Sequence, residues 1–295
     1  MSSDLELTFA RPPALWSRYP RVLFGKWPPT EQVSDLPDIS ARVAVAPLTS
    51  ARIERFATAC GYARSDAMPT TYPHIIAMPL HIAIFSSPRF PLRPMGLIHL
   101  TNRIEQNGPL ERGRDVELNV KAHNYRRADA GVAFDMTTDV VSSGASIWRE
   151  TCCFMSRWSQ PPASAGRPPR PPKAPRDAVV LTEREVTLRT AWDYARVAGD
   201  FNPIHLHEGA ARKFGLRGAI MHGMWSLAFA LAQAPVPALR HGSALETEFL
   251  TPVQLPGKVA VKEWITDGKV HRALCDVRTG RVHMYAHWVP EATRV

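Results

Sequence analysis

The stretch MHGMWSLAFALAQ, residues 221–233, is apolar on nearly every side of the helix that its composition predicts. A helix without a polar face is buried, because it has no side to present to water. We expect this helix to span about 219–233. Strands of alternating polarity are predicted after it, at 270–277 and 282–289, as in an antiparallel meander with one dry face. The second half of the chain therefore predicts a buried helix wrapped by an antiparallel sheet.

The first half of the chain repeats this order. A second apolar helix is predicted at 74–85, interrupted by Pro79, and strands follow at 131–141 and 146–155. In both halves a proline turn and a glycine turn precede a strand of period-two alternation: Pro109 and Gly113, and Pro252 and Gly257. The halves are interpreted as diverged copies, and the predicted fold class is α+β.

Residues 159–177, SQPPASAGRPPRPPKAPRD, mark the boundary between the two halves. They contain seven prolines, and proline lacks the backbone N–H that a helix interior or a central strand needs. This composition is typical of a semi-extended tether. The prediction is an N-terminal domain at 1–158, a linker at 159–177 and a C-terminal domain at 178–295.

The composition limits the classes of partner. The 295 residues, 45% of them hydrophobic and 21% charged, suit one large or two smaller globular domains. The net charge of +9 is dispersed and lies partly in the linker, so no nucleic-acid partner is expected. A dispersed positive field suits an anionic small substrate or an acidic carrier protein better. No apolar run reaches about 18 residues, so no membrane-spanning helix is predicted.

The N-terminal segment, with Asp4 and Glu6, lacks the apolar core of a secretory signal. Four cysteines, of which Cys152 and Cys153 are adjacent, do not resemble a disulfide framework. We expect Cys152 and Cys153 to take alternating strand positions. Buried thiols fit a reducing compartment, so a cytoplasmic location is expected.

The candidate chemistry begins in GDFNPIH, residues 199–205. Gly199 permits a turn after a helical stretch. Asn202 is a good N-cap and Pro203 suits the first helical position. A new helix is therefore predicted to start here and to stop at Gly215.

Within this segment, a carboxylate and an imidazole lie five positions apart, at Asp200 and His205. On one continuous helix their directions would differ by about 140°, and on a strand they would face opposite sides. The break at Asn202-Pro203 allows the two side chains to converge.

Gly223 is expected near the start of the buried helix, where the first N–H groups lack acceptors within the helix. Because glycine has no Cβ, a ligand can approach the backbone closely. A carbonyl oxygen bound there would accept a hydrogen bond and face the positive end of the helix dipole. With a carboxylate and an imidazole nearby, such a site can move a proton beside a polarised carbonyl.

Each of these residues also has a simpler explanation. Asp200 alone fits a turn or cap, His205 a surface histidine and Gly223 a helix-packing glycine. A metal site is the other alternative, with four candidate ligands: Asp200, His205, His207 and His222. His205 and His207 lie on one predicted helix two positions apart, so their rings diverge, and no metal is expected.

Several segments together resemble the signature of the MaoC-like (R)-specific enoyl-thioester hydratases and 3-hydroxyacyl-thioester dehydratases. They are Tyr194-Ala195, GDFNPIH at 199–205, Phe214-Gly215 and MHGM at 221–224. The first half is similar to that of the family members with two hot dogs, especially the mycobacterial 3-hydroxyacyl-thioester dehydratases. That similarity lies in PTTYP at 69–73 and MGLIH at 95–99. The resemblance spans most of the chain.

The resemblance implies a double hot-dog fold, in which two antiparallel sheets each wrap a central helix. The second half is implied to be catalytic. The first half lacks the Asp-x-Asn-Pro-x-His and His-Gly patterns and is expected to shape a tunnel for the acyl chain. Family members often have Asp where this chain has His207. We expect this side chain to face solvent and to affect the chemistry little.

The implied reaction is (R)-specific hydration of 2-enoyl thioesters, or dehydration of (3R)-hydroxyacyl thioesters, in fatty-acid or related lipid metabolism. The substrate is carried on coenzyme A or acyl carrier protein. Asp200 and His205 are implied to hold one water, and the Gly223 N–H to polarise the thioester carbonyl. Asn202 and His222 are implied to support the site. No cofactor is expected beyond the phosphopantetheine of the substrate.

Two other functions remain as alternatives. One is a hot-dog thioesterase, which hydrolyses the C–S bond of the same substrates. The other is a non-catalytic acyl-binding subunit. The ordered Asp-x-Asn-Pro-x-His argues against both. Monomer and homodimer are both left open.

Overall fold

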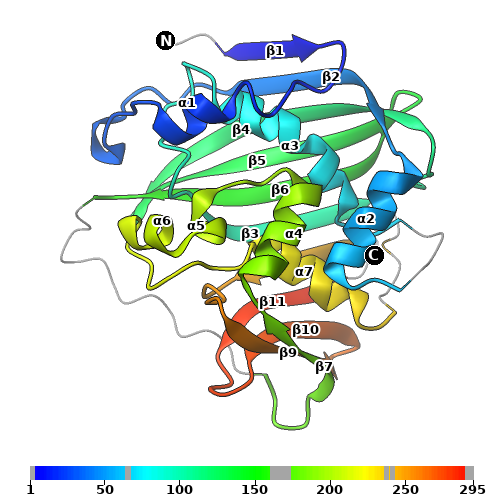
Figure 1. Ribbon diagram of the computed structural model, residues 1–295. Helices are drawn as coiled ribbons and strands as arrows, with labels where there is room; N and C mark the ends of the chain where they lie inside the picture. The colour runs from blue at the N-terminus through cyan, green and yellow to red at the C-terminus, as the bar shows by residue number, and fades with distance from the viewer. Residues whose placement is uncertain (1–3, 64–67, 160–173, 236–238, 240–242, 290–295) are drawn as a thin grey trace.

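The computed structural model describes residues 4–63, 68–159, 174–235, 239 and 243–289. A long curved sheet wraps around central helices, with the two halves of the chain at its opposite ends (Figure 1). The described strands are β1 (Leu5–Phe9), β2 (Ile39–Pro47), β3 (Ile98–Gln106), β4 (Asp115–Ala128), β5 (Gly131–Ser142), β6 (Ala145–Arg157), β7 (Val179–Val186), β8 (Ala244–Phe249), β9 (Gly257–Thr266), β10 (Lys269–Asp276) and β11 (Val282–Val289). The described helices are α1 (Tyr19–Phe24), α2 (Ser50–Cys60), α3 (Tyr72–Phe85), α4 (Leu188–Ala198), α5 (Pro203–Leu206), α6 (Glu208–Lys213) and α7 (Gly223–Ala232), with a 3₁₀ turn at Thr30–Gln32.

An internal repeat organises the sheet. Five strands of the first half lie in the order β2-β4-β5-β6-β3, and five of the second half in the order β7-β9-β10-β11-β8. The helices α3 and α7 occupy corresponding places, directly before β3 and β8. The four predicted strands correspond to β5, β6, β10 and β11, with ends within two residues of those expected. The α+β class is confirmed, and the equal strand order agrees with two diverged copies.

The two halves are joined at the edges of their sheets. Strand β3 pairs antiparallel with β8, from Thr101 opposite Glu248 to Ile104 opposite Leu245. The two expected sheets therefore form one 11-stranded sheet among the described residues. This pairing satisfies backbone groups that would otherwise stand at two open edges.

The buried helix of the second half starts later than predicted. Helix α7 begins at Gly223, whereas the sequence pattern predicts a start near 219. The N–H of Ile220 donates to Ile204 O (3.1 Å) and that of Met221 to Val253 O (2.9 Å). Because these backbone groups bond to neighbouring segments, the chain stays extended until His222 and only then turns into the helix.

Two further helix predictions need correction. Helix α3 starts at Tyr72, two residues early, and continues through Pro79 rather than stopping there. The single helix predicted from Pro203 to Gly215 is two short helices, α5 and α6, which are separated at His207. The backbone of His207 is extended, with φ at −151°, and its Nδ1 accepts from the N–H of Ala210. His207 is therefore an exposed N-cap of α6, in agreement with the prediction that it faces solvent.

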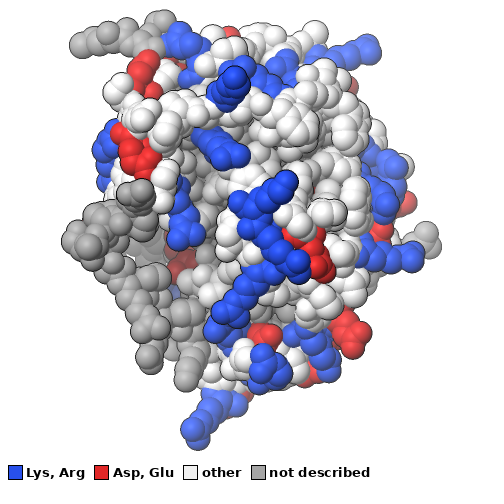
Figure 2. Space-filling model, turned by 60° about the vertical axis from the view of Figure 1, so that its left-hand side comes forward, with Lys and Arg blue, Asp and Glu red and all other residues white. Residues whose placement is uncertain are grey.

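Basic side chains are spread over the molecular surface. Figure 2 shows Lys and Arg side chains at many places over the face in view, several of them side by side near its middle. The net charge of +9 is thus distributed, as expected from the sequence. In the part of the chain that the structure describes, no helix has the length and apolar character needed to cross a bilayer.

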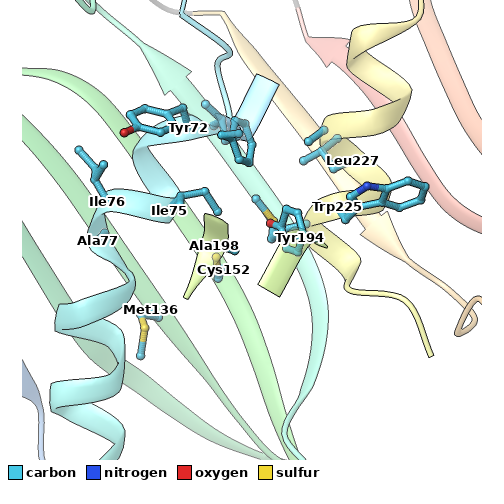
Figure 3. Packing of buried hydrophobic residues seen from close by; sticks show 14 of the residues in the cluster. Tyr72, Ile75, Ile76, Ala77, Met136, Cys152, Tyr194, Ala198, Trp225 and Leu227 are labelled. Carbon is cyan, nitrogen blue, oxygen red and sulfur yellow. The ribbon is translucent and has the colours of Figure 1, made fainter. Parts of the chain in front are cut away.

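One hydrophobic core extends through both halves. Figure 3 shows Tyr72 and Ile75 of α3 in the same cluster as Tyr194 of α4 and Trp225 of α7. Trp225 is fully buried, and its Nε1–H donates to Ala59 O at 3.1 Å. Burial of apolar surface from both halves stabilises them together. Most of the predicted linker, 160–173, lies outside the described residues, and the division at 158 and 178 stays a prediction.

All four cysteines are free thiols, as predicted. Cys152 is buried and Cys153 half-buried at successive positions of β6. Their side chains therefore alternate across the sheet, as expected for neighbours on a strand.

Candidate active site

The loop between α4 and α5 has the local structure that its sequence predicts. Gly199 ends α4 in the left-handed region, with φ at 76°, and its N–H donates to Ala195 O at 2.8 Å. Asn202 caps α5, because its Oδ1 accepts from the N–H of Ile204 at 3.3 Å. Pro203 is the first helical residue. The chain therefore reverses direction between Asp200 and the new helix.

This reversal brings the predicted site residues together. Asp200, His205 and His222 each offer a ligand atom, and these atoms lie within 4.8 Å of one another. His222 stacks on His205, with ring centroids 3.9 Å apart. The His222 Nε2 lies 3.1 Å from the backbone oxygen of Asp200 and 4.0 Å from its Oδ2. A carboxylate and two imidazoles from separate elements thus share one small volume.

Backbone contacts define which ring nitrogen of each histidine carries the proton. His205 Nδ1 lies 2.8 Å from Ile220 O, so Nδ1–H donates and Nε2 is left as an acceptor. His222 Nε2–H donates to Asp200 O, so its Nδ1 is unprotonated. The Asp200 Oδ1 accepts from the N–H of Asn202 at 3.1 Å. Asp200 and His205 Nε2 are therefore both proton acceptors.

The charge states follow from burial and from these neighbours. Burial alone would raise the pKa of the Asp200 carboxyl, but His222, His205 and the Asn202 N–H outweigh it and lower this pKa. Burial lowers the pKa of His205, although Asp200 opposes the shift. Burial and then His205 lower the pKa of His222 to about 3. At neutral pH the site contains an ionised Asp200 and two neutral imidazoles.

Gly223 is the first residue of α7, as its proposed role requires. Its N–H has no acceptor within the helix and lies at the positive end of the helix dipole. A Cβ placed on Gly223 would lie 3.2 Å from the ring of Phe249, which is tighter than ordinary contact. The absence of a side chain therefore keeps this N–H accessible beside Phe249.

These residues border a cavity of about 460 Å³ that both halves of the chain enclose. The second half supplies the polar site: Asp200, Asn202, His205, His222 and Gly223. The first half supplies a largely apolar wall from α1, α3 and the loop before β3: Val22, Met78, Ile82, Phe85, Met95 and Leu97. The first half thus shapes the cavity, as predicted. Pro94, in the loop before β3, also reaches the cavity wall.

A second polar cluster, which the sequence reasoning missed, lies in the first half. His74 Nδ1 is 2.7 Å from Glu150 Oε2, and Asn102 Nδ2 donates to Glu150 Oε1 at 2.6 Å. His81 Nε2 lies 2.9 Å from Thr138 Oγ1. His74 and His81 border the same cavity as the catalytic candidates. The available signal was two histidines seven positions apart, and so on one face, in an otherwise apolar helix.

The charges in this cluster are also set by burial and pairing. Burial alone would lower the pKa of His74, but Glu150 outweighs it and raises this pKa. Burial alone would raise the pKa of Glu150, but His74 and Asn102 lower it to about 2. His81 and His99 have pKa values lowered to about 3, first by burial and then by the charge of His74. A buried His74–Glu150 ion pair therefore lies between neutral histidines.

Two sets of side chains have metal-ligand spacing: Asp200, His205 and His222, and His74, Glu150 and Cys152. In the first set both histidines already donate an N–H to a backbone carbonyl. In the second set the imidazole and the carboxylate bond to each other. His207 belongs to neither set, contrary to the four-ligand alternative. The expectation that no metal binds stays a prediction.

Comparisons with known proteins agree with this architecture. Residues 170–286 match the model of the MaoC-like domain. The chain is 30% identical over 271 residues to 3-hydroxyacyl-thioester dehydratase X of Mycobacterium tuberculosis, covering 90% of this chain and 94% of that protein.

Solved structures resemble the chain over most of its length. The crystal structure of HtdX from Mycobacterium tuberculosis has a TM-score of 0.72 at 29% identity, covering 84% of this chain and 98% of that chain. A MaoC-like dehydratase from Phytophthora capsici has a TM-score of 0.67 at 14% identity, over 89% of this chain and 98% of that one. A conserved Mycobacterium tuberculosis protein described as a double hot dog has a TM-score of 0.56 at 13% identity, over 89% of this chain and 97% of that one. The repeat, the sheet and these likenesses show that the chain belongs to the MaoC-like family and has the double hot-dog fold.

Proposed function

We propose that this protein is a hydro-lyase that hydrates 2-enoyl thioesters, or dehydrates (3R)-hydroxyacyl thioesters, in fatty-acid or related lipid metabolism. The observation that carries the proposal is the convergence of an ionised Asp200 and a neutral His205 on the cavity that Gly223 borders. The name of its relative, 3-hydroxyacyl-thioester dehydratase X, supports the same reaction.

The two acceptors at the site match the two protons of one water molecule. Asp200 and His205 Nε2 would each accept an O–H of a water held between them. In hydration, the water oxygen forms a bond to Cβ while one acceptor removes its proton. The π electrons move toward Cα and the thioester carbonyl, and the bound proton is then delivered to Cα. Dehydration is the same path in reverse.

The thioester carbonyl gains negative charge as the water adds, so a fixed donor at its oxygen lowers the barrier. The N–H of Gly223 is suited to this task because it is the first N–H of α7 and has no side chain over it. The dipole of the helix adds to the hydrogen bond. The largely apolar wall from the first half would receive the acyl chain and exclude bulk water.

A spectrophotometric assay tests the proposal. Purified protein with 2-enoyl-CoA substrates of graded length should remove the absorbance of the conjugated enoyl thioester, and the product should be the (3R)-hydroxyacyl thioester. The Asp200→Asn variant is the matched control. Release of free thiol without hydration would instead indicate a thioesterase. Tight binding with neither reaction would indicate an acyl-binding subunit.

The expected setting of the enzyme follows from the same proposal. Its partner is an acyl-CoA or an acylated carrier protein. The substrate carries the phosphopantetheine, and we propose no separate cofactor. The free thiols support a cytoplasmic location. A homodimer stays a prediction, which light scattering on the purified protein would test.

A further inference from the structure

The N-terminal helix α1 contacts the catalytic loop through one hydroxyl group. Tyr19 Oη–H donates to the carbonyl oxygen of Gly199 at 2.5 Å. The hydroxyl oxygen of Tyr19 also accepts from the N–H of Phe201 at 3.0 Å. Gly199 and Phe201 are the residues on either side of Asp200, so one phenol holds both peptide groups that flank the carboxylate.

The surroundings of Tyr19 keep this hydroxyl in place. Tyr19 is 4% exposed and packs in a small cluster with Val22 of α1 and Met78 of α3. Before it in the chain, the ring of Trp16 contacts that of Phe201, with centroids 4.7 Å apart and ring planes tilted by 41°. The N-terminal segment therefore packs on the loop from a position about 180 residues earlier in the sequence.

The loop has few other connections that hold the carboxylate. Asp200 Oδ1 accepts from the N–H of Asn202, and its backbone oxygen accepts from His222. Gly199 lies in the left-handed region and has the wide conformational freedom of glycine. The two hydrogen bonds of the Tyr19 hydroxyl, to Gly199 O and from Phe201 N–H, are here called the Tyr19 bridge. Without this bridge the two backbone groups would lose their common partner, and the peptide planes around Asp200 could rotate.

We propose that Tyr19 is a positioning residue that fixes the Asp200 carboxylate toward the cavity, so that the N-terminal segment completes the active site. This inference rests on the proposed function of Asp200. A reacting group displaced by about 1 Å can cost roughly 10²-fold in rate. The bridge thus acts on the chemical step through the orientation of the carboxylate.

Tyr19 does not supply the proton itself. Its O–H is already donated to Gly199 O. Burial, and then the negative charge of Asp200, hold the pKa of the phenol well above its ordinary value. The phenol therefore stays protonated at neutral pH, and its effect on catalysis is indirect.

The kinetic test compares Tyr19→Phe with Tyr72→Phe. Tyr72 is also a buried tyrosine, but its hydroxyl has no hydrogen-bond partner among the described residues and lies outside the cavity wall. For crotonyl-CoA, Tyr19→Phe should lower kcat by about 10- to 100-fold with a smaller change in KM, and Tyr72→Phe should leave both unchanged. A kcat for Tyr19→Phe equal to that of Tyr72→Phe would overturn the proposal.

A double-mutant cycle asks whether Tyr19 acts through Asp200. In the Asp200→Asn background, Tyr19→Phe should lower the residual rate no further, because the group that it positions has already lost its function. If the loss of rate in the double variant equals the product of the losses in the two single variants, Tyr19 acts independently of Asp200, and the proposal is overturned.

A measurement that needs no activity separates this inference from the proposed function. Amide hydrogen exchange at Phe201, followed by NMR, should become at least about tenfold faster in Tyr19→Phe than in wild type, because its acceptor is lost. Tyr72→Phe should not change it. Unaltered exchange in Tyr19→Phe would overturn the bridge even if hydration is observed. Absence of hydration by the wild-type protein would refute the proposed function. The exchange rate of the Phe201 amide would still test whether the Tyr19 bridge holds the loop.

Discussion

The imidazole of His205 stacks on that of His222 at 3.9 Å between ring centroids, with 27° between the ring planes. His222 also donates to the backbone of Asp200. One neutral histidine therefore touches both catalytic candidates and holds their spacing. Because each ring also donates to a backbone carbonyl, neither can rotate without losing a hydrogen bond.

Removal of either acceptor should abolish most of the activity without unfolding the protein. Asp200→Asn and His205→Ala should each lower kcat for enoyl-CoA hydration by about 10²- to 10⁴-fold, the usual contribution of a positioned acid or base. Asp193→Asn is the matched control, since Asp193 lies half-exposed on α4 and pairs with Arg196. Near-wild-type turnover by Asp200→Asn would refute the mechanism.

The pH dependence of kcat/KM reports the charge state of His205. The water can give a proton to His205 only while the imidazole is neutral. Burial places the pKa of His205 below its ordinary value of 6.5. The rate should therefore rise with pH through this lowered pKa and be level at pH 7. A stopped assay at successive pH values would measure the profile, and a rise that continues above pH 7 would contradict the neutral assignment.

Gly223→Ala should weaken catalysis through steric contact. The new Cβ would lie 3.2 Å from the Phe249 ring, so the ring or the start of α7 must shift beside the N–H that we propose binds the carbonyl. We expect kcat/KM to fall by about 10²-fold, the lower end of the loss of a carbonyl donor. Gly218→Ala is the control, because its Cβ would meet its nearest atom at an ordinary 4.0 Å. Equal activity of the two variants would argue against the Gly223 contact.

The stability of the fold should fall as the solution is acidified below about pH 6.5. Burial lowers the pKa values of His81, His99 and His222 to about 3, whereas the unfolded chain binds these protons near pH 6.5. The unfolded state therefore binds more protons in this window, and each histidine contributes up to about 1.4 kcal/mol per pH unit. His74, whose pKa Glu150 raises, acts in the opposite direction but is a single group.

Urea unfolding at about pH 7 and pH 5.5 would measure this dependence. His99→Phe should flatten it, because one proton-binding group is removed from both states. A free energy of unfolding that is the same at both pH values would contradict the buried neutral histidines.

The His74–Glu150 pair should matter far more to stability than an exposed pair. Glu150→Ala leaves a buried imidazole without its counter-charge and should cost about 3–5 kcal/mol. Glu117→Ala breaks the exposed pair with Arg42 and should cost less than about 1 kcal/mol. Denaturant titrations of both variants give the comparison. Equal losses would show that the buried pair is not ionised.

Local sequence determined the elements of this protein. The largely apolar composition of 221–233 predicts the buried helix α7, since such a segment must leave water wherever it lies. Asn202-Pro203 predicts the break between Asp200 and His205, because capping and proline geometry act within a few residues. Helix ends depend also on contacts with other segments: α7 starts at Gly223 because Ile220 bonds to Ile204.

Only the tertiary structure decided how these elements meet. The His74–Glu150 pair joins residues 76 positions apart, and the Tyr19 bridge joins residues 180 positions apart. The pairing of β3 with β8 joins the sheets of the two halves. Such contacts follow from packing around a shared core, and a single sequence carries no periodic or capping signal for them. The local sequence therefore determines the conformation of the loop with Asp200, while the cavity around this loop and its contact with the Tyr19 phenol depend on the assembled fold.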